Sequence, residues 1–133
     1  MVAKSKMEES FTITNTTKST LPGVSFVKIK EVVLGKKYQL SLVFVGDKKI
    51  QTLNNSYRGK NKPTNCLSFI LDKNSGEIFL NLAKAKKEAP NFERKFDSFV
   101  AFLFIHSCLH LKGMEHGGIM EKAELKFVKK FQF

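Results

Sequence analysis

The chain has 133 residues, 42% of them hydrophobic, which is typical of a single compact domain (residues 1–133) with a real apolar core. Two cysteines are too few for a disulfide scaffold, and the polar N-terminus carries no apolar signal segment. The longest uninterrupted apolar run, residues 99–105, is far shorter than the ~20 residues of a membrane-spanning helix. We therefore expect a cytoplasmic protein without a membrane span.

The formal net charge of +11 points to a polyanionic partner. A positive field attracts polyanions and speeds their encounter, so nucleic acid is the first partner to consider. The alternative is surface lysine that an AT-rich genome accumulates without a task. Among 23 basic residues only Arg58 and Arg94 are arginines, whose planar fork can grip two phosphate oxygens at once. We favour a functional role for Arg58 and expect Arg94 to be a surface residue.

The N-terminal half of the chain alternates between strand and helix patterns. Near-alternating β-branched and aromatic residues favour strands, and apolar residues at three- and four-residue steps favour helices. In chain order, the expected elements are a strand at 9–16, a helix between Pro22 and Gly35, a strand at 38–45 and a short helix from Asp47 to Gly59.

The C-terminal half predicts a hairpin and two further helices. Residues 66–71 and 77–82 are apolar runs joined by a five-residue loop that ends in Gly76. One or two helical turns at 84–88, a buried helix at about 91–112 and an amphipathic helix after Gly118 follow. The expected fold is α/β, with a single mixed sheet of about four strands covered by helices.

All three histidines fall within eleven residues, from His106 to His116. On a helix, residues four apart share a face, so His106 and His110 can share an ion. Gly113 can end that helix in a left-handed conformation and let the chain bring His116 to the same point. The sequence therefore predicts a metal helix packed on the sheet. Core histidines bonded to backbone groups are the alternative.

Three protein ligands leave a fourth position for water, which is the pattern of a catalytic zinc ion. The spacing matches the histidine signature of metzincin proteases, but Ser107 stands where those proteases need a glutamate base. A peptidase of that type is therefore the weaker hypothesis. Glu115 could orient a ligand or take a proton, and it could equally be solvated. Cys66 and Cys108 are expected to pack in the core.

A second candidate segment places Arg58, Lys60 and Lys62 between a helix end and a buried strand. Such a loop can hold phosphates. Alternatively, cations near a helix C-terminus merely answer its dipole, an effect of about 0.3–1 kcal/mol.

Two segments, residues 57–69 and 106–116, resemble the two signatures of the YbeY family of bacterial metal-dependent endoribonucleases. The resemblance covers about residues 38–120. It implies a zinc ion held by His106, His110 and His116, an essential Arg58, and cleavage of single-stranded RNA. It also implies a role in maturing the 3′ end of small-subunit (16S) ribosomal RNA and in ribosome quality control. The chain departs from the family at Ser107, usually glycine, and lacks a proline common after Phe69.

The expected function is therefore a zinc-dependent endoribonuclease whose groove is lined by Arg58, Lys60 and Lys62. Its nucleophile is a metal-activated water or the ribose 2′-hydroxyl, and both remain open. Two other classes compete with this interpretation. One is a metal-dependent hydrolase of a non-nucleic substrate, and the other is a non-catalytic RNA- or ribosome-binding module in which zinc only holds the fold.

Overall fold

The computed structural model describes residues 10–132, so the expectations for the first nine residues lie outside the described part of the chain. In chain order the elements are β1 (Phe11–Asn15), α2 (Phe26–Val33), β2 (Gln39–Phe44), α3 (Asp47–Arg58), β3 (Cys66–Asp72), β4 (Ser75–Leu80), α4 (Leu82–Glu88), the 3₁₀ helix η1 (Ala89–Phe92), α5 (Phe96–Leu111) and α6 (Gly118–Phe131). Between residues 10 and 132, no helix is long and apolar enough to cross a bilayer.

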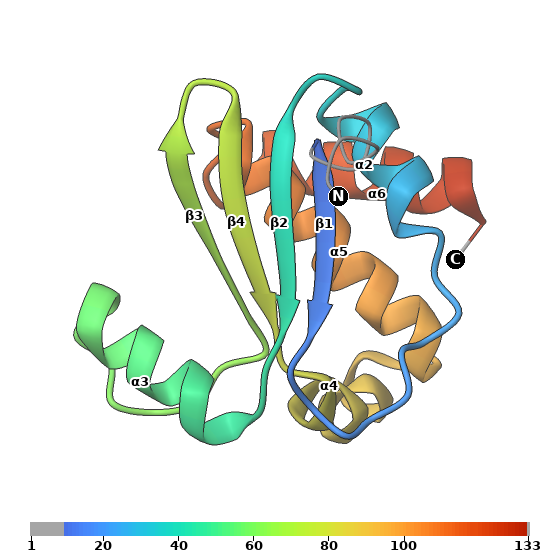
Figure 1. Cartoon of the computed structure of the whole chain (residues 1–133). Helices are drawn as coiled ribbons and strands as arrows, with labels where there is room; N and C mark the ends of the chain where they lie inside the picture. The colour runs from blue at the N-terminus through green and yellow to red at the C-terminus, as the bar shows by residue number, and fades with distance from the viewer. Residues whose placement is uncertain (1–9, 133) are drawn as a thin grey trace.

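Four strands form one mixed sheet in the order β1-β2-β4-β3 (Figure 1). The pairs β1–β2 and β2–β4 are parallel, whereas the hairpin pair β3–β4 is antiparallel. The expected mixed α/β sheet of about four strands is confirmed. Its edge strands are β1 and β3, and β3 is the strand that follows the basic loop.

The two faces of the sheet carry separate apolar clusters because side chains alternate along each strand. One face places Leu42 of β2 and Ile78 of β4 against α5, with α2, α4 and α6 completing the larger core. The other face places Leu67 and Phe79 against Ile50 of α3 in a smaller cluster. Figure 1 shows α5 lying along one side of the sheet while α3 lies apart from it near the start of β3.

The long helix α5 is apolar on nearly every side, as its sequence predicts. Ten of its sixteen residues are buried, among them Phe99, Phe104 and Cys108. Neighbouring elements surround it: it packs against β3, β4, α2, α4 and α6. A helix in this position is held on several sides, so the side chains at its C-terminal end are fixed relative to the sheet.

Two boundaries and the exposure of one side chain differ from the sequence-based expectation. Helix α5 begins at Phe96 and not near residue 91, because Pro90 lies in η1 and Glu93 adopts a left-handed φ of 55°. The hairpin turn is shorter than expected, since Gly76 belongs to β4 and pairs with Ile70. The spacing of Ile50, Leu53 and Tyr57 predicts that they share one face of α3, but Tyr57 is 69% exposed and packs against Phe69 of β3.

Lys30 is the least expected core residue. It lies on the apolar face of α2 and is only 1% exposed. Its Nζ atom donates a hydrogen bond to the Lys36 carbonyl, at 2.9 Å. Burial lowers the pKa of this ammonium from its ordinary value, because the charged form loses water.

Candidate metal centre

The C-terminal turns of α5 carry two of the three histidines. His106 and His110 lie one turn apart, and their Nε2 atoms are 3.2 Å apart. Their ring centroids are 4.6 Å apart and the rings are nearly perpendicular. The expectation that the four-residue spacing places both imidazoles on one face is therefore confirmed.

The third histidine arrives by the predicted chain reversal. Gly113 adopts a φ of 92°, and the Met114 amide donates to the Leu109 carbonyl at 3.1 Å, which ends the helix. The His116 ring centroid then lies 4.8 Å from that of His110 and 5.2 Å from that of His106. One nitrogen from each imidazole lies within 4.8 Å of the others. This arrangement can hold a metal ion.

Hydrogen bonds on the far side of two rings fix which nitrogens point inward. The Nδ1 atom of His106 contacts the Glu124 carboxylate of α6, and the Nδ1–H of His110 donates to the Met114 carbonyl at 3.0 Å. Both bonds leave Nε2 free to face the cluster. Partners of this kind orient metal-binding histidines and raise the basicity of the ligand nitrogen.

Glu124 is a site residue that the sequence analysis missed. It is buried and lies four residues after Met120, inside the apolar stripe of α6. A carboxylate on the apolar face of an amphipathic helix is costly unless it is paired. That position was the available signal, and its partner is His106.

The protonation of the site suits metal binding. Burial is the largest cause that lowers the pKa of His110, and the neighbouring imidazole of His106 lowers it further. Neutral imidazole is the form that offers a nitrogen lone pair to a metal. Three imidazoles suit zinc and other transition metals of similar softness. The residues present therefore fit the metal ion that the sequence predicts.

A cavity of about 170 Å³ opens onto the three histidines. Its other walls come from the end of α3, the loop after it and β3, including Arg58, Asn65, Cys66 and Ser68. Cys66 thus lines the cavity and does not simply pack in the core. Burial raises the pKa of its thiol to about 11, so the thiol is neutral at neutral pH. Cys108, by contrast, is fully buried in the larger core as expected.

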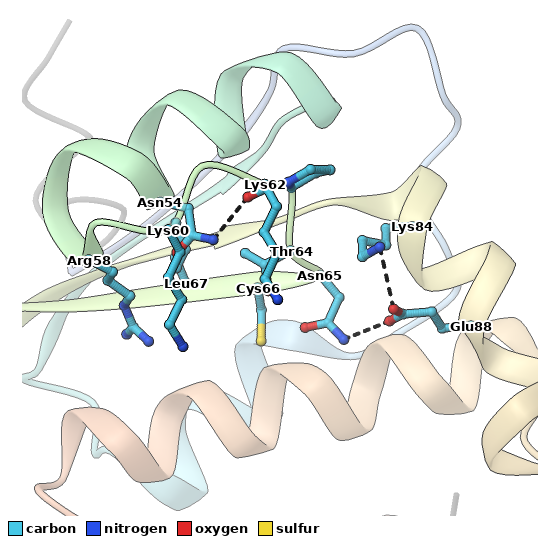
Figure 2. Close-up of a pocket in the computed structure, with 11 residues that line it drawn as sticks. Asn54, Arg58, Lys60, Lys62, Thr64, Asn65, Cys66, Leu67, Lys84 and Glu88 are labelled. Carbon is cyan, nitrogen blue, oxygen red and sulfur yellow. Dashed lines mark hydrogen bonds and ion pairs between the residues drawn. The ribbon is translucent and has the colours of Figure 1, made fainter.

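Arg58 is the last residue of α3, and the structure brings it to the histidines. Gly59 ends the helix with a φ of 68°, a left-handed conformation that turns the chain toward β3. The Arg58 side chain lines the same cavity as the three imidazoles. Figure 2 shows the guanidinium of Arg58 and the thiol of Cys66 directed toward α5.

Asparagine side chains hold the loop between α3 and β3. The Asn54 amide donates to the Lys62 carbonyl at 2.9 Å, and the Asn65 amide donates to the Glu88 carboxylate at 2.8 Å. Asn81, fully buried at the start of α4, donates to Asp47 at 2.6 Å. These bonds fix both ends of the basic loop, so its cations sit on a defined wall.

Lys60 and Lys62 line a larger hollow of about 400 Å³ beside Arg58 (Figure 2). Lys84 of α4 closes its far side, 3.6 Å from the Glu88 carboxylate. The loop cations predicted from sequence therefore share one concave surface with Arg58. Lys84 is an addition that sequence spacing could not reveal.

Two other sequence candidates lie outside the histidine cluster. Glu115 is exposed and is not among the three ligands, although it lines a neighbouring hollow. Arg94 is half-buried, with its guanidinium carbon 4.8 Å from the Phe102 ring centroid. Arg94 was expected to be a surface residue, and its side chain is instead partly covered by this contact, away from the basic loop.

The fold and the site define an α/β protein with a four-stranded mixed sheet, in which three histidines from α5 and the turn after it share one cavity with Arg58 and can hold a metal ion. A sequence model of the family described as endoribonuclease YbeY matches residues 3–132. The chain belongs to the YbeY family.

Individual relatives agree with this assignment. Endoribonuclease YbeY of Aster yellows witches'-broom phytoplasma is 39% identical over 100 residues, covering 68% of this chain and 65% of the relative. Endoribonuclease YbeY of Onion yellows phytoplasma is 38% identical over 125 residues, covering 87% and 81%. The solution structure of a Thermotoga maritima protein has a TM-score of 0.62 at 24% identity, covering 90% of this chain and 87% of that one. It is similar to this chain in fold.

Proposed function

We propose that this protein is a zinc-dependent endoribonuclease that cuts single-stranded RNA. The observation that carries the proposal is one cavity lined both by the three converging imidazoles and by the Arg58 guanidinium. Membership of the YbeY family supplies the reaction class. We further propose that the biological substrate is small-subunit ribosomal RNA, cut at its 3′ end in the cytoplasm, with ribosome quality control as the wider role.

In this proposal His106, His110 and His116 hold the metal ion. When bound, the metal supplies a Lewis acid that can polarise a phosphoryl oxygen. Arg58 faces the same cavity and donates from its planar fork to phosphate oxygens. Charge that develops at phosphorus is then stabilised by a donor that is already in place. Lys60 and Lys62 attract the flanking phosphates along the basic hollow.

Replacing Arg58 tests the catalytic role directly. Arg58→Ala should lower the rate of single-stranded RNA cleavage by about 10²–10³-fold, because a preorganised donor to the developing charge is lost. Zinc stoichiometry and thermal unfolding should stay near wild type. Arg94→Ala is the matched control, since it removes the same charge outside the cavity. A folded Arg58→Ala protein that cuts RNA as fast as Arg94→Ala contradicts the proposal.

The competing hydrolase and binding-module hypotheses predict other outcomes. Incubating the wild-type protein with casein and with single-stranded RNA, each with and without a chelator, separates them. We expect RNA cleavage that the chelator stops, and intact casein. Cleavage of casein alone favours the hydrolase, and binding of RNA without cleavage favours the module. Mapping the 3′ ends of ribosomal RNA in cells depleted of the protein tests the ribosomal substrate.

A further inference from the structure

Two larger hollows share lining residues with the histidine cavity, and these two hollows differ in chemistry. The basic hollow already described lies toward Lys60 and Lys62. A second hollow of about 440 Å³ lies toward the middle of β3 and the turn after α5. Arg58 lines all three spaces, and His110 lines both the histidine cavity and the second hollow. The three spaces therefore adjoin one another around the histidines, with Arg58 as a wall common to all of them.

Apolar groups dominate the second hollow. Ile70 of β3 is 59% exposed there, and Met114 forms part of the opposite wall. Together with Phe69, these side chains give a concave surface beside His110 an apolar lining, which is typical of a site for an apolar group. Gly113 adds a wall without a side chain. This surface is suited to a flat apolar group rather than to a charged one.

The distribution of charge places a phosphate on the basic side of Arg58 rather than in this hollow. Among the residues that line it, Arg58 at the shared boundary is the cation, while Glu115 contributes a carboxylate. On the other side of Arg58, the described lining residues include Lys60, Lys62 and Lys84. A phosphate therefore has a strong preference for the basic side. The basic hollow and the apolar hollow together suit a ligand that is anionic at one end and apolar at the other.

A single RNA strand has that character at each nucleotide. Unpaired bases present flat faces that stack on apolar side chains and on guanidinium planes. A strand with its phosphate at Arg58 and the next phosphates along the lysines would bring a neighbouring base to Ile70 and Met114. A base that is stacked inside a duplex could not enter.

We propose that the hollow between Ile70 and Met114 is a nucleobase subsite that holds one base next to the phosphate that is cut. This inference rests on the proposed endoribonuclease function. It gives a physical reason for a single-strand requirement, because only an unpaired base can be inserted. It also makes Ile70 a residue that determines how strongly this chain binds its substrate.

The test uses short single-stranded RNA in which one nucleotide at a time is replaced by an abasic ribonucleotide. For the wild-type, zinc-loaded protein, removing the base on one side of the cut should slow cleavage about tenfold. Removing the base on the other side should change the rate less than twofold. Equal rates for all abasic substrates overturn the subsite, and this comparison needs no variant to fold.

Two neighbouring variants localise the effect. Ile70→Ser should cleave intact and abasic RNA at similar rates, because the apolar wall is lost. Leu71→Ser is the matched control, since Leu71 is 63% exposed but lies outside the hollow. It should keep the wild-type discrimination, and identical behaviour of the two variants overturns the assignment to this hollow. Absence of any RNA cleavage by the wild-type protein would instead refute the proposed function itself.

Discussion

The contact between Glu124 and His106 ties the metal centre to α6. His106 lies on α5, and the carboxylate that orients it belongs to Glu124 of α6, 18 residues further along the chain. A second ligand ring, His110, is oriented by a backbone carbonyl instead. A side chain can be replaced without disturbing the fold of the ligand turn, so Glu124 offers a clean probe of the orientation of one ligand.

Glu124→Gln should weaken zinc binding about 10–100-fold, because a neutral amide is a poorer partner for the His106 ring. The measurement is competition for zinc between chelator-stripped protein and a coloured chelator. Glu121→Gln, on the exposed side of the same helix, should bind zinc like the wild type. Equal affinities for the two variants would show that the contact does not orient the ligand.

Much of the candidate site could be predicted from the sequence. The histidine spacing, Gly113 and Arg58 are local signals, and the structure brings the three imidazoles and the Arg58 guanidinium to one cavity. Glu124 and Lys84 could not be predicted, because their positions at the site depend on how α6 and α4 pack against the rest of the chain. The cavity position of Cys66 was missed for the same reason, since an apolar strand pattern does not say which face meets α5.

At the scale of elements, close packing of the sheet on α5 depends on Gly76. A Cβ atom at this position would lie 2.6 Å from the Tyr38 hydroxyl and 2.8 Å from a methyl carbon of Leu111. Both neighbours are themselves buried. Because Gly76 has no side chain, the C-terminal end of α5, which follows the histidines, can lie close to β4.

Gly76→Ala should lower the free energy of unfolding by about 1–3 kcal/mol, because the core must shift to accept an extra methyl group. Urea denaturation of the metal-free protein measures this change. Gly46→Ala serves as the control, since a Cβ atom there has nothing within 4 Å. If both variants unfold at the same urea concentration as the wild type, the packing of the sheet on α5 does not depend on Gly76.

The order and type of the elements followed from local patterns, while several details did not. Alternation and three- to four-residue spacing located all four strands and the main helices, because these patterns reflect which face is buried. The start of α5 was wrong because the left-handed Glu93 breaks the helix without a glycine. Lys30 was missed because its burial depends on a carbonyl beyond the end of its own helix.

At the scale of the whole molecule, the structure shows where part of the net charge of +11 lies. Part of it gathers along the loop between α3 and β3, beside the histidine cavity. In the proposed function, a positive field speeds the encounter with RNA. Cleavage then requires that a phosphate reaches Arg58 and the metal ion. The proposed activity therefore depends on one metal ion per chain, bound at the end of α5.

Adding zinc back to chelator-stripped protein, with single-stranded RNA cleavage as the readout, tests this claim most directly. We predict that cleavage is lost on chelation, returns in proportion to added zinc and levels off at one zinc per chain. Full cleavage by the metal-free protein, or no recovery at any zinc concentration, would contradict the account.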